Sequence, residues 1–389
     1  MDWHNLTKNN TPFFLYDFDK IKSNHAFLEK FLNLNRNKLF YSVKSNPNMC
    51  LIKKIDSFVD GFDISSFIEL QALLKFGINP QRVSFSGPGK TNEAILSALN
   101  NNIKSIHIDS IDELNFIIKL KDKFQDTDFS LRIHTKGEED KLGFNENDLN
   151  AAFEILKKED SFKLKGLHSY LGRESFSKPY FNEVLDLLDN TINRFRDHFK
   201  KDIEIFIGPG LPSVTQLSLD ANDYMNYKFP ITFELGRSLI SNIGLYGAPI
   251  LSVKEESQKI AILNGGIHHL GSSLLSVFTQ KNQDLCFFLR DGINRISTSS
   301  NEDISLYGSL CLGHDCILPH VRAPIDLKPG DWVVFNECGS YGLTASVPSF
   351  IGQDFPSEFA TYIDPSTKKS VIIDVGPKNF KIYHESFIL

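Results

Sequence analysis

Short apolar runs alternate with segments of helical apolar spacing through the first 240 residues. Phe67, Leu70 and Leu73 show that spacing, and Thr91 and Ser110, each followed by acidic residues, are typical helix starts. This alternation favours an α/β fold with a parallel sheet, because parallel strands need crossover connections. Eight units in roughly 200–250 residues favour a closed (β/α)8 TIM barrel, with an open doubly wound sheet as the alternative. The predicted strands are Leu39–Val43, Gly61–Ile64, Arg82–Phe85, Ser105–Ile108, Phe129–Ile133, Leu164–Tyr170, Ile203–Ile207 and Ile231–Glu234.

The pattern changes after about residue 243, where short β runs follow one another without long helices between them. Gly, Pro, Asn and Asp separate these runs, which predicts a second, mostly antiparallel, β-barrel-like domain. The early run Pro12–Tyr16 has no place among the eight barrel strands, so we expect it to complete the β domain. The predicted domains are 20–243 for the barrel and 1–19 with 244–389 for the β domain. The β runs are Ile250–Val253, Lys259–Leu263, Leu285–Leu289, Trp332–Phe335 and Ser370–Asp374.

Composition and charge exclude several classes of partner. The 389 residues are 41% hydrophobic and 23% charged, with a net charge of −6, which argues against a nucleic-acid groove or a polybasic membrane patch. The polar segment Met1–Asn10 and the lack of a long apolar stretch predict neither a secretory signal nor a membrane span. Five scattered cysteines favour reduced thiols in the cytoplasm. The 33 phenylalanines indicate a large apolar core.

Polar and special residues gather where the predicted barrel strands end, the edge that carries the chemistry in such barrels. Lys44 is there either a surface loop residue or a desolvated amine with a lowered pKa, as a Schiff-base lysine requires. Gly208 and Gly210 allow close backbone approach to a phosphate, and Arg237 adds positive charge. Glu234 would keep a pyridine nitrogen protonated. Together these residues predict a phosphorylated carbonyl cofactor. Other strand ends carry Asp63, Ser65, Ser86, Asp109, His134, His168 and Tyr170.

The segment Tyr41-Ser42-Val43-Lys44-Ser45-Asn46 resembles the pyridoxal-phosphate lysine motif of the decarboxylases with the alanine racemase fold (fold type III). That family includes the ornithine, arginine and diaminopimelate decarboxylases. The resemblance covers the chain from about Thr11 to beyond Pro356. Further segments in the family's order are Phe62–Ser66 with Glu69-Leu70, Ser86–Lys90, Gly166–His168, Glu234–Arg237, Gly308–Cys311 with Asp315, and Gly339–Tyr341.

The resemblance implies pyridoxal 5'-phosphate and amino-acid decarboxylation through an external aldimine and a quinonoid. Lys44 would form the internal aldimine, and Cys311, supplied by the partner subunit, would protonate the substrate carbon after carbon dioxide leaves. The family therefore implies a homodimer with shared active sites, in which Lys141 and Asp315 meet across the interface. The implied cofactor residues are Lys44, Asp63, His168, Tyr170, Gly208, Gly210, Glu234, Gly236, Arg237 and Tyr341.

Departures from the family pattern concern the cofactor ring and its phosphate. Tyr170 stands where the family places a histidine on the cofactor ring, and His168 is a second candidate for that stacking. Arg173 replaces a small serine that normally helps to hold the phosphate. Pro209 interrupts the family's glycine run and removes one backbone donor.

The predicted substrate end differs more. Ornithine-type enzymes carry acids where this chain has Leu312 and Asn264, so a free distal ammonium would lack a partner here. The tract Gly265–His269 resembles decarboxylases of secondary-metabolite pathways, which act on carrier-protein-bound or citrate-conjugated amino acids. The candidate substrate residues are His134, Asn264, His268, Leu312 and Asp315; His268 and His269 either line a channel or hold loop backbone groups.

Three alternatives to this conjugate decarboxylase remain open. A diaminopimelate- or ornithine-type decarboxylase would act on a free amino acid. A racemase or epimerase usually has arginine, not Glu234, at the ring nitrogen. An inactive regulatory homologue tends to lose the lysine or the cysteine, and both are present here. No metal site is expected, because adjacent histidines rarely converge on one ion.

Overall fold

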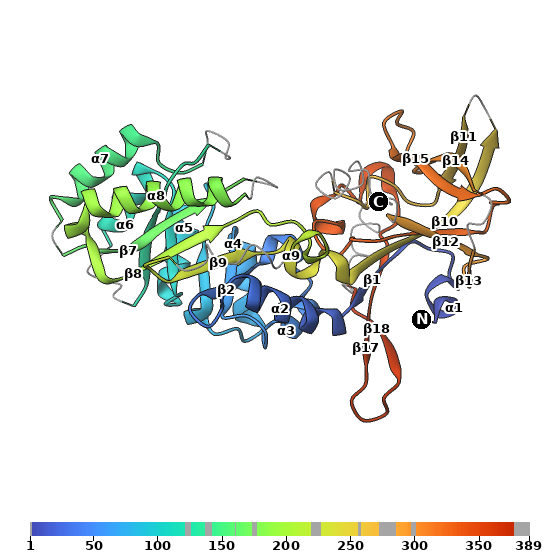
Figure 1. Cartoon of the computed structure of the whole chain (residues 1–389), viewed down its shortest axis with the longest axis horizontal. Helices are drawn as coiled ribbons and strands as arrows, with labels where there is room; N and C mark the ends of the chain where they lie inside the picture. Colours follow the sequence, from blue (N-terminus) through green and yellow to red (C-terminus); the bar gives the residue numbers. More distant parts are fainter. Residues whose placement is uncertain are drawn as a thin grey trace, which may run out of the picture. The chain divides into compact units, whose positions relative to one another are not determined.

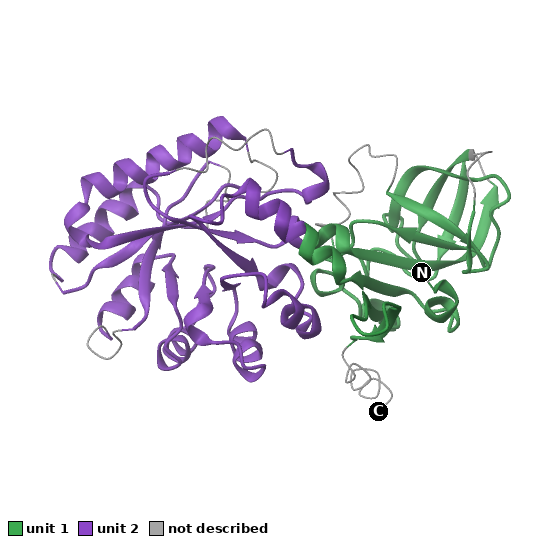
Figure 2. Ribbon diagram, turned by 60° about the horizontal axis from the view of Figure 1, so that its bottom comes forward, with its two compact units in different colours: residues 1–23, 240–389 green, residues 24–239 purple. Residues whose placement is uncertain are grey.

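The computed structural model describes residues 2–120, 126–136, 142–159, 161–172, 177–218, 227–255, 258–271, 285–296 and 301–376. The chain forms two compact units (Figure 2): unit 1 contains residues 1–23 and 240–389, and unit 2 contains residues 24–239. The boundaries predicted from the sequence, after residues 19 and 243, lie close to these limits.

Unit 2 is built around a closed barrel of parallel strands, in which the last strand pairs with the first. This closure confirms the predicted (β/α)8 barrel and excludes the open sheet. Each strand pairs with the next along the chain, as crossover connections allow. The strands are β2 (Lys38–Ser42), β3 (Gly61–Ile64), β4 (Val83–Phe85), β5 (Ser105–Ile108), β6 (Asp128–Arg132), β7 (Leu164–Tyr170), β8 (Phe199–Gly208) and β9 (Ile231–Leu235).

One helix precedes the first barrel strand, and helices follow most of the barrel strands, as Figure 1 shows. Side-chain caps define their starts: Thr91 accepts the backbone N–H of Ala94, and Ser110 accepts that of Glu113. Both predicted helix starts are thus confirmed. The helices are α2 (Asp19–Phe31), α3 (Met49–Ile55), α4 (Phe67–Lys75), α5 (Asn92–Asn100), α6 (Ile111–Ile118), α7 (Glu146–Leu156), α8 (Lys178–Arg194) and α9 (Arg237–Ile240).

The barrel interior is unusually polar. Along β5, Ile106 and Ile108 alternate with Ser105 and His107, and all four residues are buried. Because strand side chains alternate between two faces, the apolar pair lies on one face and the polar pair on the other. His107 contacts ring and carboxylate groups of β7, β8 and β9, so the polar face is the interior one. The interior therefore holds ionisable groups rather than the branched apolar layers that fill many such barrels.

Unit 1 is a mostly antiparallel β structure. Its strand β1 (Phe13–Asp17) lies between β10 (Gly244–Glu255), to which it is antiparallel, and β17 (Ser357–Ile363), to which it is parallel. The early run was therefore correctly assigned to the β domain. The other strands are β11 (Lys259–Leu263), β12 (Cys286–Arg290), β13 (Asn294–Arg295), β14 (Asn301–Tyr307), β15 (Cys316–Pro324), β16 (Trp332–Phe335) and β18 (Ser370–Asp374), and a short helix, α1 (Trp3–Thr7), precedes β1.

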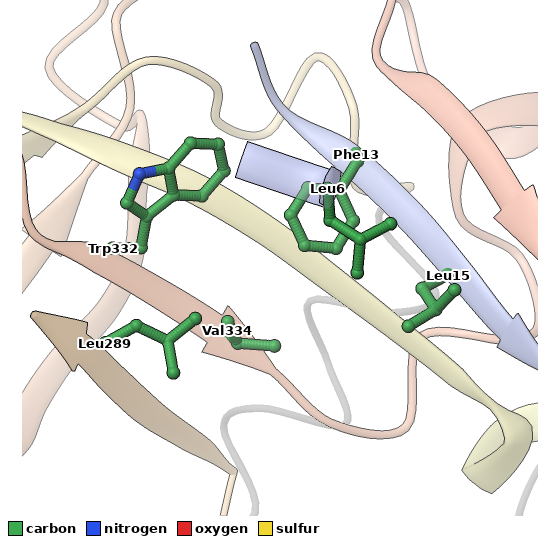
Figure 3. Close-up of a cluster of buried hydrophobic side chains, with 6 residues drawn as sticks. All are labelled: Leu6, Phe13, Leu15, Leu289, Trp332 and Val334. Atoms are coloured by element: carbon green, nitrogen blue, oxygen red, sulfur yellow. The ribbon is translucent and has the colours of Figure 1, made fainter. Parts of the chain in front are cut away.

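A buried apolar cluster ties the amino-terminal segment into unit 1 (Figure 3). Phe13 and Leu15 of β1 pack with Leu289 of β12 and with Trp332, whose ring lies 5.7 Å from that of Phe13. Leu6 of α1 and Val334 complete the cluster, which is at most 3% exposed at any of these residues. Burying this surface stabilises the sheet by roughly 25 cal/mol per Å² of apolar area.

Among the described helices, we find none long and apolar enough to cross a membrane.

Candidate active site

Lys44 sits in a tight turn at the carboxyl end of β2. The turn Val43–Ser45 is a 3-10 helix, closed by a hydrogen bond from Ser45 Oγ to the Ser42 carbonyl at 2.7 Å. The Lys44 ammonium lies 3.8 Å from Asp63 Oδ2, and 48% of its side chain is exposed. The sequence left open whether Lys44 is a surface residue or a desolvated amine. In this chain the Lys44 amine is not desolvated, because the surrounding residues leave it open to solvent.

Asp63, on β3, is a buried carboxyl beside that lysine, with 1% of its surface exposed. Burial and the nearby charge of Glu234 raise its pKa to about 8, although the Lys44 ammonium acts in the opposite direction. Asp63 therefore carries a proton at neutral pH, and Glu234 is the ionised carboxylate of the two.

Glu234, on β9, meets two histidines of neighbouring strands inside the barrel. His168 Nε2 lies 3.0 Å from Glu234 Oε2, and His107 Nε2 lies 3.3 Å from Oε1. Burial alone would raise the pKa of Glu234, but the two histidines outweigh it and hold the pKa well below the usual range. Burial lowers the pKa of His168 to about 4, so at neutral pH its neutral ring donates Nε2–H to the carboxylate.

One oxygen of Glu234 remains available. Oε1 is buried and has no hydrogen-bond partner, although His107 Nε2 lies 3.3 Å from it. A buried carboxylate oxygen without a donor is costly, and a protonated pyridine nitrogen would satisfy it. The donor set therefore fits a pyridoxal ring, with Glu234 at its nitrogen.

Sequence reasoning missed two interior residues, His107 and Arg132. Arg132 Nη1 lies 3.4 Å from Asp109 Oδ2, and both are buried. Nearby, Lys90 and Glu113 form a buried ion pair at 3.2 Å. The signal was present in the sequence, since His107 and Arg132 occupy the polar positions of strands whose alternate residues are Ile, Leu or Phe.

Close approach explains two of the predicted glycines, and a positive φ explains a third. A Cβ at Gly208 would come within 2.8 Å of the Tyr170 ring, and one at Gly236 would come within 2.5 Å of Ser45 Cβ. Gly210 adopts a φ of 62°, which glycine accepts without strain. Gly236 thus lets the start of α9, with Arg237, lie against the turn that carries Lys44.

The remaining predicted barrel residues have varied surroundings. His134 is half-buried, and its Nδ1 lies 3.0 Å from the Leu142 carbonyl. The Tyr170 carbonyl accepts a hydrogen bond from Thr135 Oγ1 at 2.6 Å. Lys141 and Arg173 lie outside the described residues.

Two loops of unit 1 are joined around Asp315. Its Oδ1 accepts the N–H of Ile267 at 3.0 Å and its Oδ2 accepts that of Leu310 at 2.8 Å. The carboxyl group is buried, and a Cβ at Gly308 would collide with it at 2.3 Å. Cys311, at the tip of this loop, is exposed.

The histidine pair of unit 1 divides into two environments. His269 is held by the Tyr246 hydroxyl at 2.9 Å and by the Asp354 carbonyl at 2.9 Å, so it fixes its loop. His268 is fully buried against His269, and neither of its ring nitrogens has a hydrogen-bond partner. Burial lowers the pKa of His268 to about 4.

Two further predicted residues belong to unit 1. Asn264 Nδ2 lies 3.4 Å from the Asn10 carbonyl. Tyr341 has a φ of 53° and follows Ser340, which is hydrogen-bonded to Ser241 at 2.7 Å. The predicted site residues are thus divided between the units: Lys44, Asp63, His134, His168, Tyr170, Gly208, Gly210, Glu234, Gly236 and Arg237 in unit 2, and Asn264, His268, Cys311, Leu312, Asp315 and Tyr341 in unit 1.

Comparison with known proteins decides the family. Residues 18–227, more than half of the chain, match the pyridoxal binding domain of the pyridoxal-dependent decarboxylases. The chain belongs to this family. The predicted enzyme class, a carboxy-lyase, and the predicted cofactor, pyridoxal 5'-phosphate, are thereby confirmed for this pyridoxal-dependent amino-acid decarboxylase.

Relatives of this decarboxylase include enzymes with conjugated substrates. It is 26% identical to L-glutamyl-[BtrI acyl-carrier protein] decarboxylase of Niallia circulans, over 91% of this chain and 89% of that protein. It is 23% identical to 2-[(L-alanin-3-ylcarbamoyl)methyl]-2-hydroxybutanedioate decarboxylase of Staphylococcus aureus, over 90% and 94%. The structure of diaminopimelate decarboxylase from Helicobacter pylori shares its fold, with a TM-score of 0.80 at 22% identity over 99% of this chain and 100% of that one.

Proposed function

We propose that this enzyme decarboxylates an amino acid whose distal end is joined in a neutral conjugate, either to a carrier protein or to a small carboxylic acid. The two relatives with carrier-protein and carbamoyl-linked substrates support this substrate class. A decarboxylase of free diaminopimelate or ornithine is the second candidate, because proteins with those activities are also similar to this chain.

The observation that carries the proposal is the charge of the two loops around Cys311. Across segments 264–271 and 308–315, Asp315 is the one acid, and its carboxyl group is buried and bound to backbone N–H groups. Leu312, directly after Cys311, is half-buried and apolar. A free distal ammonium would find on these loops only the Asp315 carboxyl, whose two oxygens already accept backbone N–H groups, whereas an amide or thioester needs no acid.

Residues of unit 2 would hold the cofactor. Glu234 Oε1 would accept from its ring nitrogen, Gly208, Gly210 and Arg237 would approach its phosphate, and Lys44 Nζ would bind its carbonyl carbon. The environment of His168, already bonded to Glu234, favours Tyr170 as the side chain against the ring. When bound, pyridoxal phosphate supplies an electron sink for the electron pair that carbon dioxide leaves behind.

Cys311 is the proposed proton donor, from Sγ to the substrate α-carbon. Its exposure at the tip of the unit 1 loop is consistent with insertion into the site of a partner subunit, in a homodimer. A racemase is disfavoured by Glu234, and an inactive regulator by the presence of both Lys44 and Cys311.

The test is carbon dioxide release by wild type, Cys311→Ala and Cys50→Ala. Cys50 is the matched control, because it is also an exposed, free cysteine but lies on α3 of unit 2. We expect Cys311→Ala to lower turnover at least about 100-fold, in line with loss of a general acid, and Cys50→Ala to retain it. Equal turnover by all three proteins would refute the role of Cys311.

A further inference from the structure

We propose that His168, with His107 stacked on it, is a positioning residue that orients the ionised Glu234 carboxylate and leaves Oε1 as the acceptor for the cofactor's ring nitrogen. This inference rests on the proposed role of Glu234. It assigns a function to two buried interior histidines, one of which, His107, was not among the site residues predicted from the sequence.

The two carboxylate oxygens of Glu234 have different surroundings. His168 Nε2 donates to Oε2 at 3.0 Å, which fixes the rotation of the carboxylate. The His107 ring lies against the His168 ring, with centroids 4.5 Å apart and planes 23° apart, and against Phe206 at 4.5 Å. His107 thus holds the His168 ring in place, while its own Nε2 lies 3.3 Å from Oε1, which has no hydrogen-bond partner.

The burial of Glu234 explains why such support is needed. The Glu234 carboxylate is buried at the end of β9, largely out of contact with water. Burial favours its protonated form, which could no longer accept from a protonated ring nitrogen. The hydrogen bond from His168 opposes this effect of burial. On its other sides, His168 faces His107 and the Arg132 guanidinium, which both favour its neutral, donating form.

The side chains of His107, His168 and Glu234 also lie close enough together to hold a metal ion, since their candidate ligand atoms fall within 4.8 Å of one another. The nearby Arg132 charge and the protonated state of Asp63 make the site a poor one for a cation. We therefore infer the hydrogen-bonded arrangement and make metal binding an outcome of the test.

The test compares the full-length wild type with His168→Leu, His168→Gln, His107→Phe and Phe206→Leu. Glutamine keeps an N–H near the position of His168 Nε2, and leucine does not. Phe206→Leu removes packing from the same layer without removing a donor, and serves as the matched control. We expect His168→Leu to lower kcat about 10- to 100-fold with KM changed less than about twofold, and to alter the absorbance of bound cofactor. Glutamine should recover most of the kcat and the absorbance, and Phe206→Leu should retain both.

A second measurement does not require that the leucine variant folds or that the substrate is known. In ¹⁵N-histidine NMR spectra of the cofactor-free wild type, His168 should be protonated on Nε2 alone at pH 7 and should titrate near its pKa of about 4. Titration near 6.5, or His168→Leu with unchanged kinetics and absorbance, would overturn the proposal. The proposal would also be overturned if the wild type bound one equivalent of metal and the histidine variants did not. These spectra do not depend on which substrate the enzyme uses. A failure of the conjugate-substrate proposal can therefore be distinguished from a failure of the role proposed for His168.

Discussion

At the scale of single residues, the strand ends were predictable and the interior was not. Lys44 and Glu234 were identified because the resemblance and the strand ends coincide on them. The alternation along β5 places His107 on the polar face, but it does not identify the partners of this histidine, which come from β7 and β9. The burial considered for Lys44 is absent, since its turn faces outward from the strand end and leaves 48% of the side chain exposed.

The low pKa of His168 predicts a contribution to the free energy of unfolding that depends on pH. The unfolded chain protonates this histidine below about pH 6.5, whereas the folded protein keeps it neutral to about pH 4, so stability falls as the pH falls between these values. His168→Gln should remove this contribution, worth up to about 3 kcal/mol. Urea unfolding of wild type and variant from pH 7 to pH 4 measures the difference. Parallel pH dependences for the two proteins would contradict the assignment.

At the scale of elements, strands with clear alternation and near-sequence partners were predictable. β3 and β5 begin and end where the sequence predicts, whereas β8 begins earlier, at Phe199, because the polar run Lys200–Asp202 hides its start. β17 was not predicted at all. It lies between β18, its neighbour in the sequence, and β1, which is over 300 residues away, and the pairing with β1 leaves little local signal.

Gly236→Ala tests how tightly α9 lies against the turn of Lys44. The added Cβ would come within 2.5 Å of Ser45 Cβ, so the turn must shift. We expect a loss of about 1–3 kcal/mol in the free energy of unfolding and weaker binding of pyridoxal phosphate. Gly89→Ala is the control, because its Cβ would meet nothing within 4 Å. Thermal unfolding and cofactor titration measure both; equal effects of the two substitutions would refute the close approach.

At the scale of the whole molecule, two units and a closed barrel could be predicted because the sequence pattern changes near residue 243. The candidate site could be predicted only in halves. Lys44 lies in unit 2 and Cys311 in unit 1.

Mixing two inactive variants tests the proposed shared site. Lys44→Ala and Cys311→Ala should each be inactive, but co-refolded mixtures should regain about a quarter of wild-type activity, because half of the random dimers contain one intact site. Carbon dioxide release after co-refolding measures this. Mixtures as inactive as the separate variants would place both residues within one subunit.

The most direct test of the proposed function is a pair of substrates that differ only at the distal nitrogen. The rate of carbon dioxide release would be compared for free 2,3-diaminopropionate and for the same amino acid with its distal amine acylated by a carboxylic acid. Because the one acid among the described residues of the loops around Cys311, Asp315, is buried and bound to backbone N–H groups, we predict kcat/KM at least about 100-fold higher for the acylated compound, the effect of roughly 3 kcal/mol. A higher kcat/KM for the free amine would contradict the proposal.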